Sequence, residues 1–590
     1  MKTIQNLNCF GVKKILAGIL TGMMALHWCN AVSANIFTIT DTNDSLKVTS
    51  LRGAVIAANH IAGKNVILLG KKTKAGTSQP HPWIYQLTLA SSSANDSQGG
   101  DLDFSGANLT IIGVTSNVVI SAAGLGDRVI QIQARSSLTL SNLTLTGGTA
   151  PANIDNGNEA NGGGIYNSGV LKLIKCTVTG NASGAGGYTT LFGSHSCPGG
   201  NGGGIFNQGS VQLITCLISN NITGNGTGPD ENGFSSGAGN GGAIYNIGTM
   251  TLTNCRLSDN ACGQGGNSGI FIGSITPINS PGLRGSGGGS GGGIYNAGRL
   301  HINACTIDNN VAGLGGNGRG SGGAGGNGGG GGDGGGIYNA QDLSLTNCTL
   351  SDNFAGEGGT GGHSWYAPGG TGGDGGNGGG IFNAGTMRLT ACTVALNSAG
   401  IGGNGGNSQN YNASALGGTG GFGGGLLNAA GATNAFVRNS LLALNTPNVG
   451  GLGGTNTSFS FSSTGNKTEI TTGAIGAAGA GCDVFGDFTS QGFNLVSIAD
   501  DSTGFTNGVS ADQVGSSTIP INPLLDVLQM NGGYTPTHAL LVGSPAIDQG
   551  NSFGLRTDQR GHKRPQNNSS IPNASGGNGS DIGAYEADVP

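Results

Sequence analysis

Three aspartates are the residues of this chain best suited to acid–base chemistry. Asp259, Asp308 and Asp352 lie near one corner of three successive repeated units. Clustered carboxylates of this kind carry out proton transfer in polysaccharide lyases and glycoside hydrolases. Each of the three directly precedes an asparagine beside a predicted turn, where aspartate is common for structural reasons, and no basic residue accompanies them at a fixed offset. We therefore predict a protein without enzymatic activity and keep these aspartates as fallback catalytic candidates.

A row of aromatic residues is the candidate binding surface. Each unit has one aromatic residue after an isoleucine, and strand alternation turns that ring outward if the isoleucine points inward. An outward aromatic strip suits a sugar or a partner protein. The competing interpretation is that neighbouring glycine-rich segments fold over the strip and bury it. The strip consists of Tyr166, Phe206, Tyr245, Tyr295, Tyr338 and Phe382.

Asparagines recur at two fixed positions of each unit. They tolerate the left-handed conformation of sharp turns, and their side chains can hydrogen-bond to one another in a ladder. The first set is Asn167, Asn207, Asn246, Asn296, Asn339 and Asn383, and the second is Asn181, Asn221, Asn260, Asn310, Asn353 and Asn397. Turn and ladder requirements explain both sets, so we predict a structural role for them.

One cysteine follows nine residues after each first asparagine. The six are Cys176, Cys216, Cys255, Cys305, Cys348 and Cys392. On adjacent parallel strands about 4.8 Å apart they have poor disulfide geometry, so we expect buried thiols that behave as small apolar side chains. Cys197 and Cys262 lie between units and could form a loop disulfide. No Cys-x-x-Cys or Cys/His pairing exists, so we predict no metal and no cofactor.

The repeated unit that carries these residues predicts the fold. It reads Gly-Gly-(Gly/Ala)-Ile-aromatic-Asn and begins at Gly162, Gly202, Gly241, Gly291, Gly334 and Gly378. Spacing inside a unit is constant, whereas the units recur at intervals of 39 to 50 residues, which is typical of a solenoid with insertions at one corner. Each unit divides into three short strands, near 164–166, 171–173 and 176–178 in the first, and these make one coil of a parallel β-helix. The spacers, rich in Gly, Asn and Ser, are predicted to protrude along one side as loops or extended glycine-rich pleats.

Composition and charge exclude several classes of protein. The chain has 590 residues, 123 of them glycine, and 9% are charged. Residues 1–34 resemble a secretory signal peptide, which predicts a secreted protein at the cell surface or outside the cell. The net charge of −5 becomes −8 when the three lysines of that segment are removed, which argues against nucleic acid as a partner. No later segment is apolar enough to span a membrane as a helix.

Several segments resemble known families of exported proteins. The Gly-Gly-(Gly/Ala)-Ile motif and the closing asparagine, as in residues 178–181, resemble repeats of polymorphic outer-membrane proteins. Residues 50–59 resemble the CSLREA domain that opens many exported bacterial β-helix proteins. Residues 522–586, including Gly543-Ser544-Pro545-Ala546-Ile547-Asp548 and Asp581-Ile582-Gly583-Ala584-Tyr585-Glu586, resemble the choice-of-anchor Q domain. These resemblances imply a right-handed parallel β-helix and surface or extracellular residence, and they imply no activity.

We therefore predict an all-β right-handed parallel β-helix with an N-terminal helical cap and a C-terminal capping domain. The signal peptide (1–34) precedes a CSLREA-like cap with the first strands (35–107), a β-helix with glycine-rich insertions (108–480), and the last coils with the choice-of-anchor Q-like domain (481–590). The favoured function is adhesin-like, non-enzymatic binding of surface glycans or of host or matrix proteins. The alternatives are a polysaccharide lyase or glycoside hydrolase, and a purely structural spacer whose glycine-rich loops pack on themselves.

Overall fold

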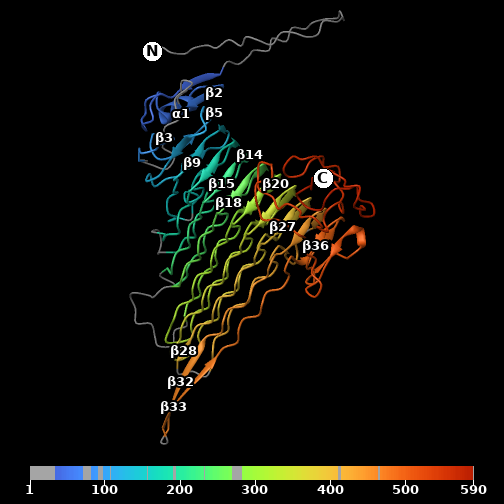
Figure 1. The fold of residues 1–590 in the computed structure, drawn as a ribbon. Helices are drawn as coiled ribbons and strands as arrows, with labels where there is room; N and C mark the ends of the chain where they lie inside the picture. Colours follow the sequence, from blue (N-terminus) through green and yellow to red (C-terminus); the bar gives the residue numbers. More distant parts are fainter. Residues whose placement is uncertain are drawn as a thin grey trace, which may run out of the picture.

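The computed structural model describes residues 34–588 except 71–81, 91–97, 107, 156, 190–194, 231–232, 269–281, 410–412, 433 and 463–464. The predicted signal peptide therefore lies outside the described residues but for Ala34. The rest forms a right-handed parallel β-helix, as the sequence predicted. Its coils run from an N-terminal end next to α1 to a C-terminal end next to β36 (Figure 1).

Three parallel sheets run the length of the solenoid, and each coil contributes one strand to each sheet. Sheet 1 contains β1 (Asn35–Thr38), β2 (Lys64–Leu69), β5 (Asn108–Gly113), β8 (Ser137–Ser141), β11 (Val170–Ile174), β14 (Ser210–Ile214), β17 (Thr249–Thr253), β20 (Arg299–Asn303), β23 (Asp342–Thr346), β26 (Thr386–Thr390), β30 (Ala435–Arg438) and β35 (Thr489–Ser490). Sheet 2 contains β4 (Leu102–Phe104), β7 (Ile130–Ile132), β10 (Ile165–Asn167), β13 (Ile205–Asn207), β16 (Ile244–Asn246), β19 (Ile294–Asn296), β22 (Ile337–Asn339), β25 (Ile381–Asn383), β29 (Leu426–Asn428), β34 (Val484–Asp487) and β37 (Ser502–Thr503). Sheet 3 contains β3 (Trp83–Gln86), β6 (Val118–Ser121), β9 (Thr144–Thr146), β12 (Thr177–Thr179), β15 (Leu217–Ser219), β18 (Arg256–Ser258), β21 (Thr306–Asp308), β24 (Thr349–Ser351), β27 (Thr393–Ala395), β31 (Leu441–Ala443), β36 (Leu495–Val496) and β38 (Gln513–Val514).

The core is a set of columns of like aliphatic residues. In sheet 2, Ile165 pairs with Ile205, and that isoleucine position stays fully buried through Ile381. In sheet 1, alternation buries Leu171 and Leu173 and leaves Lys172 between them more exposed. In-register stacking buries each apolar side chain against its counterparts in the neighbouring coils, so a narrow core suffices.

A single α-helix, α1 (Leu51–Asn59), covers the N-terminal end, where the sequence placed it. Ser50 is its N-cap and accepts a hydrogen bond from the amide of Gly53. Leu51, Ala54 and Val55 join the hydrophobic core. The guanidinium of Arg52 is buried, where it pairs with Asp44 at 2.7 Å and donates to the carbonyls of Gly100 and Asp101. The helix thus covers the apolar end of the first coils.

The glycine-rich spacers pack side by side into a body that we call the glycine bundle. It projects from the solenoid and ends at a three-stranded sheet of β28 (Ser408–Gln409), β32 (Thr455–Ser462) and β33 (Gly465–Thr472) (Figure 1). Outward segments form one layer and return segments the other. Outward segments are 183–187, 223–228, 262–268, 312–320, 355–363, 399–407 and 448–454, and return segments are 198–201, 234–240, 282–290, 324–333, 369–377, 415–422 and 473–481. The spacers therefore gather on one side, and they pack on themselves.

Hydrogen bonds inside the glycine bundle repeat every three residues. The amide of Gly332 donates to Gly313 in the opposite layer at 2.8 Å, and the amide of Gly331 donates to Asp374 in its own layer at 2.9 Å. A three-residue period is that of the polyproline II conformation, which has no internal hydrogen bonds and must find partners on other chains. Two glycines of each triplet face other segments, and the third position faces solvent. Glycine is needed at the first two because a Cβ on Gly329 would lie 2.0 Å from the carbonyl oxygen of Ser286.

The C-terminal segment, residues 515–588, lies along the outer face of sheet 3. Thr306 donates to the carbonyl of Pro536 at 2.6 Å, Thr349 donates to Gln559 at 2.7 Å, and the Thr393 hydroxyl accepts from the amide of Ala584 at 3.0 Å. We expected this segment to cap the solenoid. It covers the side of the later coils because these outward-facing threonine hydroxyls find partners in its backbone and in the Gln559 side chain.

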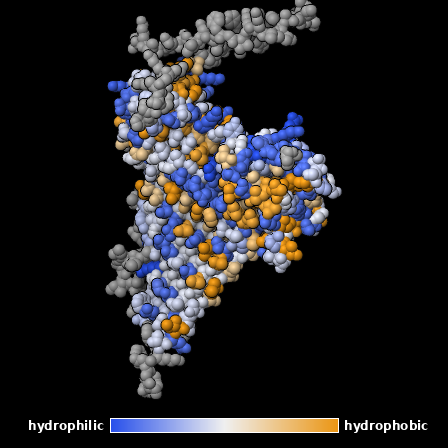
Figure 2. Space-filling view, viewed as in Figure 1, coloured by the Kyte–Doolittle hydropathy of each residue, from blue (hydrophilic) through white to orange (hydrophobic). Residues whose placement is uncertain are grey.

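Hydrophobic residues are prominent on the visible face of the C-terminal segment (Figure 2). Within the C-terminal segment, the side chains of Val527, Met530, Tyr534 and Val542 are exposed. Within the described residues, α1 is the only α-helix, and no helix has the length and hydropathy needed to cross a membrane.

Candidate functional site

The three predicted aspartates lie at one corner of the solenoid, in three successive coils. Asp259 and Asp352 occupy the turn itself, with φ of 59° and 54°, so they take the left-handed conformation that aspartate and asparagine tolerate. Asp308 lies one position earlier and is 4% exposed. Arg256 holds it through two hydrogen bonds of 2.9 and 2.6 Å.

Arg256 is the basic residue that no fixed sequence offset revealed, because it comes from the preceding coil. Burial raises the pKa of Asp308, and the Arg256 guanidinium opposes that rise. In the described part of the chain, no group of three His, Cys, Asp or Glu side chains is arranged to hold a metal ion. The corner therefore shows an ion pair and two turn residues.

The six aromatic residues form a continuous stack. Successive ring centroids are 5.1, 5.3, 4.9, 4.7 and 5.0 Å apart, and the ring planes differ by 10° or less. Each ring covers the face of the next, so a ligand alongside the stack meets ring edges. Burial raises the pKa of Tyr338 to about 12. The stack is half-buried in its central part, and Tyr166 and Phe206 at its N-terminal end are 9% and 3% exposed.

Both asparagine sets form side-chain ladders. The amide of Asn167 donates to Asn207 at 2.8 Å, and equivalent bonds continue to Asn428. The second set runs from Asn181 and ends on Asp483, whose carboxylate accepts from Asn445 at 2.9 Å. These ladders are buried, and the asparagine side-chain amides satisfy one another, so they need no ligand as a partner.

The cysteine column is a row of free, buried thiols. The amide of Cys255 donates to the sulfur of Cys305 at 3.2 Å, and burial raises the pKa of Cys176 to about 12. Cys197 and Cys262 are also free. The loop disulfide suggested for that pair is therefore wrong in this structure: Cys262 begins an outward segment of the glycine bundle, whereas Cys197 directly precedes a return segment.

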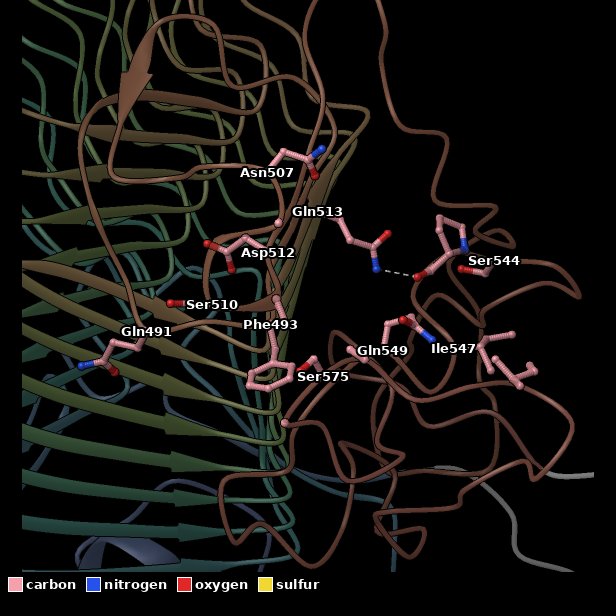
Figure 3. Close-up of a pocket in the computed structure, with 16 residues that line it drawn as sticks. Gln491, Phe493, Asn507, Ser510, Asp512, Gln513, Ser544, Ile547, Gln549 and Ser575 are labelled. Carbon is pink, nitrogen blue, oxygen red and sulfur yellow. Dashed lines mark hydrogen bonds between the residues drawn. The ribbon is translucent and has the colours of Figure 1, made fainter.

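A large cleft lies between the last coils and the C-terminal segment, and sequence reasoning missed it. This cleft has a volume of about 1060 Å³. Phe493, Gln491 and Asn507 come from the solenoid side, and Ile547 and Gln549 come from the C-terminal segment (Figure 3). No motif could have revealed the cleft, because its two walls are separated in sequence and only the lateral docking of the C-terminal segment brings them together.

The walls of the cleft are linked and positioned by hydrogen bonds. Gln513 donates across the cleft to the carbonyl of Pro545 at 2.8 Å (Figure 3). Gln549 donates to Pro572 at 2.8 Å, which leaves its carbonyl oxygen available as an acceptor. Phe493 sits at a corner with φ of 58° and packs edge-to-face on Phe553 at 5.9 Å. A bulky residue with positive φ is uncommon, and here it directs the ring to the cleft wall.

The cleft carries almost no charge. Among its described lining residues, Asp512 alone has an ionisable side chain, and its carboxylate accepts from Ser490 at 2.5 Å and from Asn494 at 3.1 Å. The Gln491, Ser510 and Ser575 side chains make no hydrogen bond with another described residue. An aromatic ring, short apolar side chains and uncommitted amides and hydroxyls together suit a neutral ligand with both apolar and hydroxyl surfaces.

Comparison of the sequence with family models and with curated proteins gives no match. The parallel β-solenoid itself is established by the three sheets, and the finer family resemblances of the repeats and the two ends remain predictions.

Proposed function

We propose that this chain is an exported, adhesin-like surface or matrix protein that binds a neutral glycan without chemical turnover and presents its glycine-rich segments as a rigid bundle. The observation that carries the proposal is the nearly uncharged cleft beside Phe493. Carbohydrates combine weakly polar C–H faces, which pack on aromatic rings, with hydroxyls that exchange hydrogen bonds with amides. The cleft offers both kinds of partner and no free carboxylate for catalysis.

The two alternatives receive different support. Self-packing of the spacers is what the structural-spacer alternative expects, so the glycine bundle by itself does not argue for a ligand. The enzyme alternative needs an accessible acid and base, and Asp308 is held by Arg256 instead. A long rigid rod also favours multivalent attachment, since many copies on one surface multiply weak contacts.

The test is a glycan and extracellular-matrix array with protein spanning residues 35–590, together with reducing-sugar and unsaturated-product assays on the same polysaccharides. We expect binding to neutral glycans without turnover. Turnover would overturn the proposal in favour of the enzyme, and no binding to any array member would overturn it in favour of the spacer.

Two variants locate the binding. Phe493→Leu keeps an apolar side chain but removes the aromatic face, and Gln491→Ala removes an exposed amide that makes no hydrogen bond to another described residue. We expect each to weaken binding at least threefold, whereas Gln341→Ala, an exposed glutamine in a turn of the solenoid, has no effect. Unchanged binding in both variants would show that the ligand binds outside the cleft.

A further inference from the structure

A second, smaller pocket lies at the other end of the solenoid, where the aromatic stack begins. The column that holds the stack starts with Asp103 in β4 and Gln131 in β7, and Tyr166 in β10 is its first ring. The pocket next to this start has a volume of about 230 Å³. Its lining includes Asp101, Asp127, Arg128, Gln131, Glu159 and Tyr166, and we call it the Asp101 pocket.

Two buried polar groups that line the Asp101 pocket have no hydrogen-bond partner. The Asp101 side chain is 5% exposed, and its Oδ2 atom is unsatisfied. Arg128 is 6% exposed, and its Nε atom is also unsatisfied. A buried donor or acceptor left without a partner costs about 1–3 kcal/mol, and more if it is charged. Such a pair in one pocket indicates a place prepared for a ligand that supplies both an acceptor and a donor.

The other bonds of Arg128 fix its orientation. Its two terminal nitrogens donate to the Gln131 side chain and to the carbonyl of Glu159, and its guanidinium carbon lies 5.4 Å from the centre of the Tyr166 ring. Asp127 accepts from the backbone amides of Arg128 at 2.8 Å and of Asp101 at 3.3 Å. The unsatisfied Nε is therefore a fixed donor on a rigid wall.

The charges around the pocket restrict what can enter it. A cation would be repelled by the Arg128 guanidinium. No described set of three carboxylates, thiols or imidazoles is arranged to hold a metal ion. An anion would be repelled by the carboxylates of Asp127 and Glu159. Burial, followed by the neighbouring Asp103 and Asp127, raises the pKa of Asp101 well above its usual range. These conditions favour a ligand without net charge.

We propose that the Asp101 pocket binds a single uncharged sugar residue, with one hydroxyl donating to the Asp101 carboxyl and a neighbouring oxygen accepting from Nε of Arg128. Sugars present adjacent hydroxyls that donate and accept at once. The pocket is smaller than the roughly 300–1,000 Å³ of sites for drug-sized ligands, so one ring suits it better than a chain. This site is independent of the cleft beside Phe493.

The test is saturation-transfer NMR and calorimetry of the protein spanning residues 35–590 with glucose, galactose, mannose and N-acetylglucosamine. Glucuronate, glucosamine and Ca²⁺ serve as charged probes. We expect saturable binding of at least one neutral sugar, weakened at least tenfold by Arg128→Lys, which removes Nε, and by Asp101→Asn. Arg284→Lys in the glycine bundle is the control that should leave this binding unchanged.

Three outcomes would overturn the proposal: no neutral sugar binds, binding survives both pocket variants, or a charged probe binds in their place. Loss of binding in Gln491→Ala alone would assign the sugar to the cleft and overturn the pocket proposal without touching the proposed function. If either pocket variant fails to fold, the test is a crystal structure of the unaltered protein soaked with the sugar that binds. Electron density for the sugar is expected beside Asp101, and its absence there would contradict the proposal.

Discussion

At the scale of single residues, several acidic side chains are buried away from the water that would normally keep them ionised. Asp483 ends the second asparagine ladder and Asp581 lies within the C-terminal segment, and both are almost fully buried. Burial raises the pKa of each to about 7, and the nearby Glu586 adds to the effect on Asp581. Their protonation state is therefore coupled to folding.

This coupling predicts that the protein loses stability as the pH rises from about 4 to 7. A carboxyl whose pKa is about 7 in the folded state and 3.8 in the unfolded state binds its proton more tightly when folded. Its contribution to stability is therefore complete below pH 3.8 and is lost as the pH rises through 7. We expect the free energy of unfolding to fall by roughly 2–4 kcal/mol between pH 5 and pH 8. Denaturant titrations across that range measure it.

His538 acts in the opposite direction, because burial lowers its pKa and its contribution is lost as the pH falls. His538 is one group, whereas burial strongly raises the pKa of Asp101, Asp483 and Asp581, so the decline in stability toward pH 8 should dominate. The matched variant is Asp483→Asn, which keeps the acceptor for Asn445 but cannot titrate, and its pH slope should be shallower. A free energy of unfolding that increases from pH 5 to pH 8 would contradict this account.

At the scale of elements, the repeats could be predicted from sequence because each strand position is dictated by local alternation. Residues 171–173 were expected as a strand, and β11 spans Val170–Ile174. Helix α1 (51–59) lies within the expected N-terminal helical cap. The spacers were harder, since glycine tracts carry no side-chain pattern, and their order comes from backbone hydrogen bonds between segments about 40 residues apart. Neither the Arg256–Asp308 pair nor the Asp101 pocket follows from local pattern, because each joins different coils.

The glycine bundle makes a position-specific prediction about neighbouring glycines. A Cβ on Gly329 would lie 2.0 Å from the Ser286 carbonyl oxygen, whereas a Cβ on Gly330 meets nothing closer than 3.7 Å. We expect Gly329→Ala to lower stability by about 1–3 kcal/mol through overpacking and Gly330→Ala to change it by less than about 0.5 kcal/mol.

Thermal unfolding and hydrogen exchange of bundle amides, such as that of Gly332, measure the difference between these two variants. Faster exchange is expected in Gly329→Ala alone. Equal effects of the two alanines would mean that the layers do not pack in this register.

At the scale of the whole molecule, one buried glutamine joins the C-terminal segment to the solenoid. Gln559 is 2% exposed, accepts from Thr349 at 2.7 Å and donates to Thr306 at 2.8 Å and to Thr535 at 2.9 Å. Without it, three buried hydroxyls lose a partner, at about 1–3 kcal/mol for each group left unsatisfied. The docking of this segment also builds the cleft, so its stability bears directly on binding.

We therefore expect Gln559→Ala to loosen the C-terminal segment while the coils stay folded. Arg560 is 7% exposed, so trypsin should cleave after it much faster in the variant than in the unaltered protein. The control is Gln566→Ala, since that half-exposed side chain makes only a 3.4 Å bond to Asp588. Unchanged cleavage in Gln559→Ala would show that other contacts suffice to hold the segment.

The triplet period of the glycine bundle also allows the length of the projection to change independently of the diameter of the solenoid. One Gly-Gly-X triplet added to an outward segment and one to its return segment would lengthen the projection by about 9 Å, at roughly 3.1 Å per residue. The coils that anchor it would keep their strands, their ladders and their diameter. Successive spacers of unequal length can then taper the tip, and a lineage of such proteins can tune how far it extends from a surface by counting in threes.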